Sequence, residues 1–246
     1  AEAVAVICKP GSAYSVGDTC NILVGKVKMA SVARINKNVE TSVFDTSSPR
    51  RLNMVETTNK VLAIGASTGG VQALTSVLSA FPANAPGTVV VQHMPANFTT
   101  SFAERLNQIC AVKVDEAKNG DHVIPGRVLI APGGFHMLLQ RSGAEYYVTI
   151  KDGPQVCHQR PSVEVLFNSV AKYAGANAVG AILTGMGNDG ASGLLKMRQS
   201  GAHTLAQDEA SSIVFGMPKA AIELGGAEKI VPLSEVARTL LNLAMN

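Results

Sequence analysis

Aromatic residues are scarce in this sequence of 246 residues: they make up 4% of it, and tryptophan is absent. Charged residues are also few, at 16%. The excess of basic over acidic side chains lies within residues 1–60, because residues 61–246 carry 13 of each sign. Nucleic-acid binding calls for a basic surface and for aromatic side chains on which bases can stack. We therefore expect no nucleic acid among the partners.

Long apolar runs are missing as well. There is no stretch of about 18 apolar residues, and the N-terminus lacks the basic and apolar segments of a signal peptide. The four cysteines, Cys8, Cys20, Cys110 and Cys157, are far apart and form no C-x-x-C pair, which argues against a disulfide framework and a zinc site. The sequence predicts a cytoplasmic protein with reduced thiols, no membrane insertion, no metal and no other cofactor.

Residues 1–59 differ in character from the rest of the chain. Residues 3–9 have the pattern of a short strand, and apolar residues recur at helical spacing between lysines over residues 22–35. Residues 36–59 are rich in Asn, Thr, Ser and Arg without a clean period, which is typical of a linker. We expect a domain boundary near residue 60.

From residue 60 onward, short apolar runs alternate with amphipathic segments. This rhythm predicts an α/β fold, a doubly wound and mostly parallel sheet with helices on both faces, together with one β-hairpin. In such sheets ligands bind outside the C-terminal ends of the strands. Strands are expected at 61–65, 88–93, 128–131, 137–140, 146–150, 178–184, 203–207 and 229–231, and helices at 71–81, 99–110, 162–174 (with Ser162 as a candidate N-cap), 191–199, 218–224 and 234–245.

The first of these strands ends in Gly65-Ala-Ser67-Thr-Gly-Gly70, which contains the pattern G-x-S-x-G. In that motif the serine sits on a sharp strand-to-helix turn and its hydroxyl projects from the sheet. Glycine-rich turns also cradle phosphates, although the lysine of a P-loop and the spacing of a dinucleotide turn are absent. Ser67 is a candidate nucleophile, with a phosphate or nucleotide turn and a purely structural turn as the alternatives.

Two further candidates stand at the ends of other strands. His93 ends the second strand, and neighbouring parallel strands lie about 4.8 Å apart, so its side chain can meet Ser67. Asp189 lies in the glycine-rich segment 183–190, which leaves a third strand and enters a helix. This aspartate is either an N-cap or the carboxylate that orients the histidine of a triad. The glycines around it favour backbone N–H groups that face an oxyanion.

Taken together, these segments resemble the catalytic domain of the bacterial chemotaxis protein-glutamate methylesterases, the CheB family, from residue 61 to the end. The resemblance implies that Ser67 is the nucleophile, His93 the general base and acid, and Asp189 the orienting carboxylate. It places the Met186 N–H in the oxyanion hole, where we expect the Thr68 N–H to join it. The resemblance rests on Ile64-Gly-Ala-Ser-Thr-Gly-Gly, Gln92-His-Met-Pro, Ser101-Phe-Ala-Glu-Arg-Leu, Ala131-Pro-Gly, His136-Met, Arg160-Pro-Ser-Val, Ile182-Leu-Thr-Gly-Met-Gly-Asn-Asp-Gly, Ala206-Gln and Phe215-Gly-Met-Pro.

The resemblance also implies a function. Members of this family demethylate glutamate γ-methyl esters on the cytoplasmic helices of methyl-accepting chemoreceptors and release methanol, and some also deamidate receptor glutamines. They need no cofactor. The residues by themselves leave open a nucleotide- or phosphate-binding module and a small-molecule esterase or deamidase on the same triad.

The resemblance divides the chain as well. Lys9-Pro10 resembles the end of a receiver domain's last strand, and residues 22–35 resemble the helix between the two domains. Residues 1–59 are interpreted as a receiver-domain remnant with a linker helix and a linker, and residues 60–246 as the methylesterase catalytic domain. Because residues 1–59 are too few for a complete receiver domain, the chain is expected to be a fragment or to carry a degenerate regulatory domain. The phosphoacceptor aspartate is missing, so regulation by phosphorylation is not predicted. A receiver domain outside this chain is a further expected partner.

Overall fold

A computed structural model describes residue 27 and residues 59–245 of the chain. The strand at 3–9 and nearly all of the helix and linker expected before residue 60 therefore lie outside the described residues. Within that region Val27 is helical. The domain boundary near residue 60 stays a prediction. No helix among residues 59–245 is long and apolar enough to cross a membrane.

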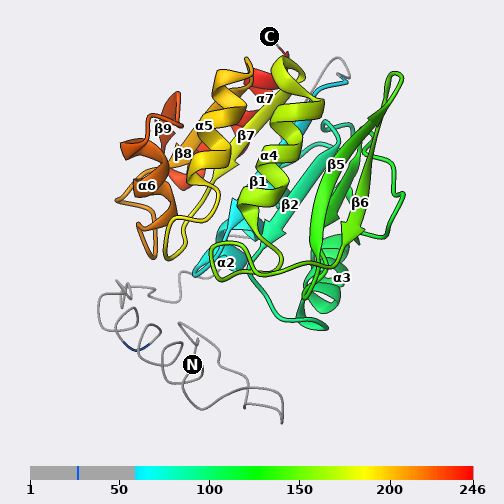
Figure 1. Cartoon of the computed structure of the whole chain (residues 1–246), viewed down its shortest axis with the longest axis horizontal. Coiled ribbons are helices and arrows are strands. Elements are labelled where there is room, and N and C mark those ends of the chain that lie inside the picture. The colour runs from blue at the N-terminus through cyan, green and yellow to red at the C-terminus, as the bar shows by residue number, and fades with distance from the viewer. Residues whose placement is uncertain (1–26, 28–58, 246) are drawn as a thin grey trace.

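A seven-stranded sheet forms the centre of the fold (Figure 1). Its strands are β1 (Val61–Ala66), β2 (Thr88–Gln92), β3 (Lys113–Glu116), β4 (Arg127–Ile130), β7 (Ala178–Ile182), β8 (His203–Gln207) and β9 (Lys229–Val231). They lie in the order β3-β4-β2-β1-β7-β8-β9, and every neighbouring pair is parallel. On one side of β1 the chain adds β2, then the edge strand β3, and then β4 between them. It returns to the other side of β1 to add β7, β8 and β9 in order.

Helices cover both faces of this sheet (Figure 1). Side chains alternate along a strand, so Leu62 and Ile64 of β1 belong to one apolar core and Val61 and Ala63 to the other. The predicted doubly wound α/β fold is confirmed. The first core includes α2 (Gly70–Ser79), α3 (Phe98–Ile109) and α7 (Leu233–Met245), and the second includes α4 (Val163–Tyr173), α5 (Ala191–Gln199) and α6 (Met217–Glu223).

The predicted β-hairpin is also present, between β5 (His136–Ser142) and β6 (Glu145–Lys151). The two strands pair antiparallel from Ser142 and Glu145 at the turn, where Gly143 has a φ of 59°. Both strands are longer than expected because polar residues continue the pairing beyond the apolar runs. The hairpin contributes Met137, Leu139, Tyr146 and Val148 to the second core.

One strand, β3, was not predicted. Its sequence Lys113-Val-Asp-Glu contains a single buried apolar residue, Val114, so it has no apolar run to signal a strand. It lies at the edge of the sheet, where only one side of the strand is paired. Charged side chains are common on such edges because they discourage pairing with another chain.

Candidate active site

The three candidate catalytic residues follow the C-terminal ends of three neighbouring strands. Ser67 comes directly after β1 and His93 directly after β2, and the His93 N–H donates to the Ala66 carbonyl at 3.1 Å. On the other side, the Ser67 N–H donates to the carbonyl of Thr184, just beyond β7, at 3.0 Å. Asp189 lies in the connection from β7 to α5. Since β2 and β7 flank β1, all three residues gather at one edge of the sheet.

His93 and Asp189 are in direct contact. The Nε2 atom of His93 lies 2.7 Å from Oδ2 of Asp189, and the two side chains are 6% and 3% exposed. A carboxylate only accepts, so Nε2 donates to Asp189 and Nδ1 is the ring nitrogen left for another partner. Nδ1 is buried and has no hydrogen-bond partner among residues 59–245. The structure thus joins the histidine to the aspartate and places Ser67 beside them, without a hydrogen bond from its hydroxyl to Nδ1.

Asp189 is buried, with 2% of its surface exposed, and each of its two oxygens accepts two hydrogen bonds. Oδ2 accepts from His93 Nε2 and from the Val163 N–H, both at 2.7 Å. Oδ1 accepts from the Ser162 hydroxyl at 2.8 Å and from the Glu164 N–H at 3.0 Å. The carboxylate is therefore held in one orientation.

These contacts correct one alternative for Asp189. It does not cap its own helix: the N-cap of α5 is Gly190, and no side chain caps that helix from this position. Asp189 instead accepts two N–H groups from the first turn of α4, where the positive end of the helix dipole favours a carboxylate. The candidate N-cap Ser162 is confirmed, because its side chain accepts a hydrogen bond from the Val165 N–H.

The charge state of Asp189 follows from these neighbours. Burial by itself would raise the pKa of this carboxyl group. The hydrogen bond and the charge of His93, with the hydrogen bonds from Ser162 and from the Glu164 N–H, outweigh burial and lower the pKa below its ordinary value. Asp189 is therefore ionised at neutral pH, as a residue that stabilises an imidazolium must be.

Of the two residues expected to hold an oxyanion, Thr68 is next to Ser67 in the chain, and Met186 follows a glycine that packs against Ser67. Thr68 follows Ser67 directly, and its carbonyl accepts the Thr184 hydroxyl at 2.9 Å. Gly185, which precedes Met186, is packed so closely that a Cβ atom there would lie 2.7 Å from the Ser67 Cβ. Glycine is needed at this position for steric reasons. That the Thr68 and Met186 N–H groups point at an oxyanion stays a prediction.

Two buried glutamines, for which no role was predicted, fix the backbone around Ser67. Gln92 Nε2 donates to the carbonyls of Ser67, at 2.9 Å, and of His93, at 3.2 Å. Gln207 Oε1 accepts the Thr184 N–H at 2.8 Å. Both glutamines end a strand, and each stood in a motif of the family resemblance, which was the only available signal. Their amide groups continue the connection between paired strands beyond the last backbone pairs, Gln92 at the ends of β1 and β2 and Gln207 at the ends of β7 and β8.

The alternative of a phosphate cradle at residues 65–70 has little support in the geometry. Such a cradle needs backbone N–H groups that point at the ligand. Here the Ser67 N–H is bonded to Thr184 and the Gly70 N–H to the Ser67 carbonyl at 2.8 Å. The turn uses these donors to hold its own shape.

The profile of the family described as "CheB methylesterase" matches residues 62–240. The chain belongs to the CheB methylesterase family. Its curated relatives include a protein-glutamate methylesterase/protein-glutamine glutaminase 2 of Syntrophus aciditrophicus, 57% identical over 242 residues that cover 98% of this chain and 71% of the relative. A protein of the same name from Albidiferax ferrireducens is 53% identical over 98% of this chain and 72% of its own length.

A solved structure of the CheB family matches the fold. It is the CheB methylesterase catalytic domain of Thermotoga maritima, with a TM-score of 0.73 and 37% sequence identity. The match covers 75% of this chain and 98% of that domain. The α/β fold is therefore that of a CheB catalytic domain.

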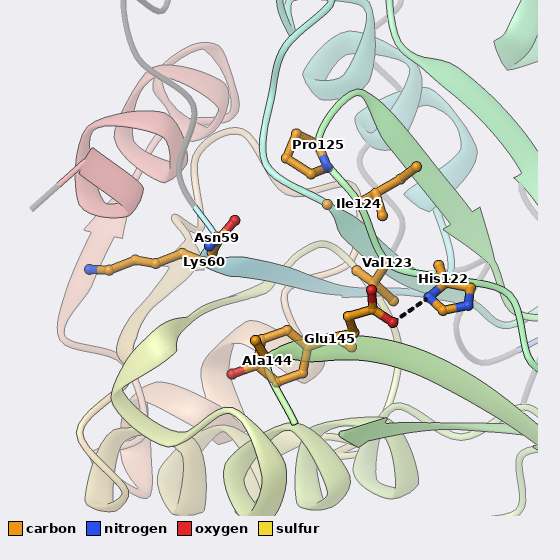
Figure 2. A pocket seen from close by; sticks show the side chains of 10 residues that line it. Asn59, Lys60, His122, Val123, Ile124, Pro125, Ala144 and Glu145 are labelled. Carbon is orange, nitrogen blue, oxygen red and sulfur yellow. Dashed lines mark ion pairs between the residues drawn. The ribbon is translucent and has the colours of Figure 1, made fainter. Parts of the chain in front are cut away.

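A pocket of about 130 Å³ lies away from this candidate active site (Figure 2). It is lined by residues that precede β1 and β2, Lys60 and Gly87, and by His122 and Glu145, which form an ion pair at 3.7 Å. Lys60 and Gly87 are at the N-terminal ends of central strands, whereas Ser67, His93 and Asp189 follow the C-terminal ends. The pocket is thus separate from the site.

Two of the four cysteines lie within the described residues, and both are free. Burial raises the pKa of Cys110 to about 11. Cys157 is exposed, and its pKa is raised by partial burial, by the negative charges of Asp189 and Glu164 and by a side-chain hydrogen bond to Asp189. Both thiols are protonated at neutral pH, so neither competes with Ser67 as a nucleophile.

Proposed function

We propose that this chain is a serine hydrolase that removes the methyl group from glutamate γ-methyl esters on bacterial chemoreceptors, in chemotaxis adaptation. One observation carries the proposal: in a member of the CheB methylesterase family, a buried His93–Asp189 pair lies beside Ser67 at the C-terminal edge of the sheet. The pair supplies the base, and the serine supplies the nucleophile. The receptors' cytoplasmic helices are the protein partner, and the enzyme works in the cytoplasm.

In the first step, the Ser67 hydroxyl attacks the ester carbonyl and transfers its proton to Nδ1 of His93. The assignment of Nδ1 rests on the hydrogen bond that already occupies Nε2. The negative charge of Asp189 stabilises the imidazolium that forms. The backbone N–H groups of Thr68 and Met186 hold the oxyanion, and the imidazolium then protonates the departing methoxide, which leaves as methanol.

In the second step, water enters and loses a proton to Nδ1 while it attacks the acyl-enzyme. The tetrahedral intermediate collapses, Ser67 regains its proton, and a glutamate carboxylate remains on the receptor. A glutamine side chain follows the same route with ammonia as the leaving group. Two of the relatives carry the name protein-glutamine glutaminase alongside methylesterase, which supports this second activity for the chain.

Replacement of Ser67 by alanine tests the proposal directly. Methanol release from methylated receptor membranes should fall by about a millionfold, because triads lose that much when the nucleophile is removed. Ser76→Ala is a matched control: this serine is exposed on α2, the helix that follows the nucleophile, and the variant should keep full activity. Methanol release by Ser67→Ala at the rate of the unchanged chain would disprove the assignment.

The same preparations separate the remaining alternatives. Ammonia release from receptors that carry glutamine at the methylation positions measures the glutaminase activity. If small free esters are hydrolysed in a Ser67-dependent way while methylated receptors are not, the chain is a small-molecule esterase and the receptor is not its substrate. Thermal stabilisation by a nucleotide, without esterase activity, would favour the nucleotide-binding module.

A further inference from the structure

Ser162 is a fully buried residue that lies immediately before α4 and contacts the candidate active site through Asp189. Its hydroxyl donates to Oδ1 of Asp189 at 2.8 Å. The same oxygen accepts the Val165 N–H at 3.4 Å. The direction of both bonds is fixed, because a carboxylate accepts and a backbone N–H donates. The single hydroxyl proton of Ser162 is thus committed to Asp189.

The four donors around Asp189 differ in how they depend on the sequence. Two are backbone N–H groups of α4, which any non-proline residue supplies. One is His93, the proposed base. The fourth is the buried hydroxyl of Ser162, at 2.8 Å from Oδ1, and a further side-chain hydrogen bond to this carboxylate comes from the exposed thiol of Cys157. Ser162 bonds Oδ1, the oxygen that His93 does not use, and together with the Glu164 N–H it restrains rotation of the carboxylate.

Ser162 is itself held by a second buried histidine. The Ser162 N–H lies 3.3 Å from Nδ1 of His136, and the Nε2 atom of that ring lies 2.9 Å from the carbonyl of Pro154. Both contacts are satisfied when His136 is neutral, with its proton on Nε2. His136 is 5% exposed and belongs to β5 of the hairpin. A chain of hydrogen bonds thus runs from Pro154 through His136 and Ser162 to Asp189.

We infer that Ser162 is a positioning residue of the hydrolase: its hydroxyl fixes Oδ1 of Asp189, so that Oδ2 stays aligned with Nε2 of His93. This inference rests on the proposed function. Without the hydroxyl, Asp189 loses a partner in a buried site, and its carboxylate samples orientations in which His93 is less well aligned and its imidazolium less stabilised. Substrate does not touch Ser162, so kcat falls and KM does not change.

Ser162 also caps α4, and the choice of variants separates capping from positioning. Glycine is nearly as good an N-cap as serine, whereas alanine is clearly worse. Neither supplies a hydroxyl. If Ser162 positions Asp189, Ser162→Gly and Ser162→Ala lose the same activity although they differ in stability. If Ser162 acts only through the helix, the glycine variant keeps its activity.

The experiment measures initial rates of methanol release against receptor concentration, at a temperature below the lowest unfolding midpoint of the variants. For both Ser162→Gly and Ser162→Ala we expect kcat to fall about 10- to 100-fold, the loss that accompanies removal of one hydrogen bond to a buried charged group, with KM unchanged. Ser169→Ala is the control. This buried serine of the same helix bonds the Leu139 N–H and the Leu166 carbonyl, so its loss should change stability and leave kcat alone.

The outcomes are distinct. Three outcomes would overturn the inference: wild-type kcat in both variants, a loss confined to Ser162→Ala, or failure of both variants to fold. Each of them would mean that Ser162 only stabilises the helix or has no role in the reaction. Ser67→Ala is assayed in parallel. If Ser67→Ala retains activity, the proposed function itself is wrong. If Ser67→Ala is inactive and both Ser162 variants are fully active, only the inference about Ser162 is wrong.

Discussion

At the scale of single residues, the two oxygens of Asp189 each serve a histidine or serine side chain and a backbone N–H of α4. A residue that replaces Asp189 must therefore accept hydrogen bonds at the positions of both carboxylate oxygens. Asparagine fails this requirement, because its amide nitrogen would face a donor wherever it is placed. The orientation of His93 and the start of α4 consequently depend on the same negative charge.

Asp189→Asn should therefore lower stability in a pH-dependent way. The folded-state pKa of Asp189 lies below its ordinary value, so the stability it contributes is fully present above the unfolded pKa, about 3.9, and is lost as the pH falls through the lower folded pKa. We expect the variant to be less stable by about 3 kcal/mol at pH 7. The difference should hold down to about pH 5 and shrink below pH 4, as measured by urea unfolding at each pH.

Asp152→Asn provides the comparison for this experiment. Asp152 pairs with Arg160, but its side chain is 76% exposed, so water screens the pair and the substitution should change stability little at any pH. A stability difference for Asp189→Asn that persists undiminished at pH 3 would mean that the carboxylate charge is not what holds α4.

The sequence predicted the three residues that stand at strand ends but not the residues that hold them. Ser67, His93 and Asp189 could be found because a glycine-rich motif or a strand end marks each position. Ser162 could be recognised only as a helix cap. Its bond to Asp189 depends on how α4 packs against the end of β7, and nothing local in the sequence records a contact between residues 27 positions apart.

At the scale of elements, α4 and α5 begin side by side and cap each other. Asp189, which precedes α5, accepts N–H groups from the first turn of α4. In return Glu164, in the first turn of α4, accepts the Gly193 N–H of α5 at 2.7 Å. Each helix is thus capped by a carboxylate that belongs to, or directly precedes, the other helix. The carboxylate lies at the N-terminal end, where the helix dipole favours a negative charge. The close approach requires glycine at 193, because a Cβ atom there would lie 2.7 Å from the Phe167 Cβ.

Glu164→Ala removes one half of this exchange without touching Asp189. We expect a loss of about 1 to 2 kcal/mol in the free energy of unfolding, the usual cost of a lost N-cap. Glu164→Gln should lose less, since its amide oxygen still accepts from Gly193. Both variants should retain kcat, because none of the four bonds to Asp189 involves the Glu164 side chain. A large fall in kcat for the glutamine variant would show instead that Glu164 acts in the reaction.

Elements were predictable in proportion to their apolar content. The buried central strands and the amphipathic helices appear close to their expected bounds, because burial on both faces or along one stripe leaves a clear pattern. The strand β3 was missed because it lies at the edge and carries charged side chains, which resemble a loop. The reciprocal caps were not predicted either, since each depends on where the partner helix begins.

At the scale of the whole molecule, the strand order explains why the candidate triad appears along the chain as serine, histidine, aspartate. β1 is central, and the chain places β2 on one side of it early and β7 on the other side much later. The histidine after β2 and the aspartate after β7 therefore come from opposite neighbours of β1, 96 residues apart, and meet beyond its C-terminal end. The sequence predicted a doubly wound sheet but not this order, because strand neighbours are fixed by packing over long separations.

The same architecture bears on the proposed domain boundary near residue 60. The strand β1 begins at Val61 in the centre of the sheet, and Lys60 is tied to the last helix by a bond from Nζ to the Leu243 carbonyl at 3.3 Å. The solved catalytic domain of Thermotoga maritima, which is matched over 98% of its length, has a similar extent. These observations favour residues 60–246 as a catalytic domain with a complete core of its own.

A chain that starts at Asn59 should therefore fold and react like the full chain. We expect its unfolding midpoint to stay within a few degrees, since a loss of 1 kcal/mol shifts the midpoint of a domain of this size by about 2 to 4 °C. Its kcat for methanol release from a short peptide that carries a glutamate methyl ester should equal that of the full chain. A chain that starts at Ile64 is the control: it lacks half of the central strand and should not fold. If the Asn59 chain unfolds far below the full chain, residues before 59 contribute to the core and the boundary is misplaced.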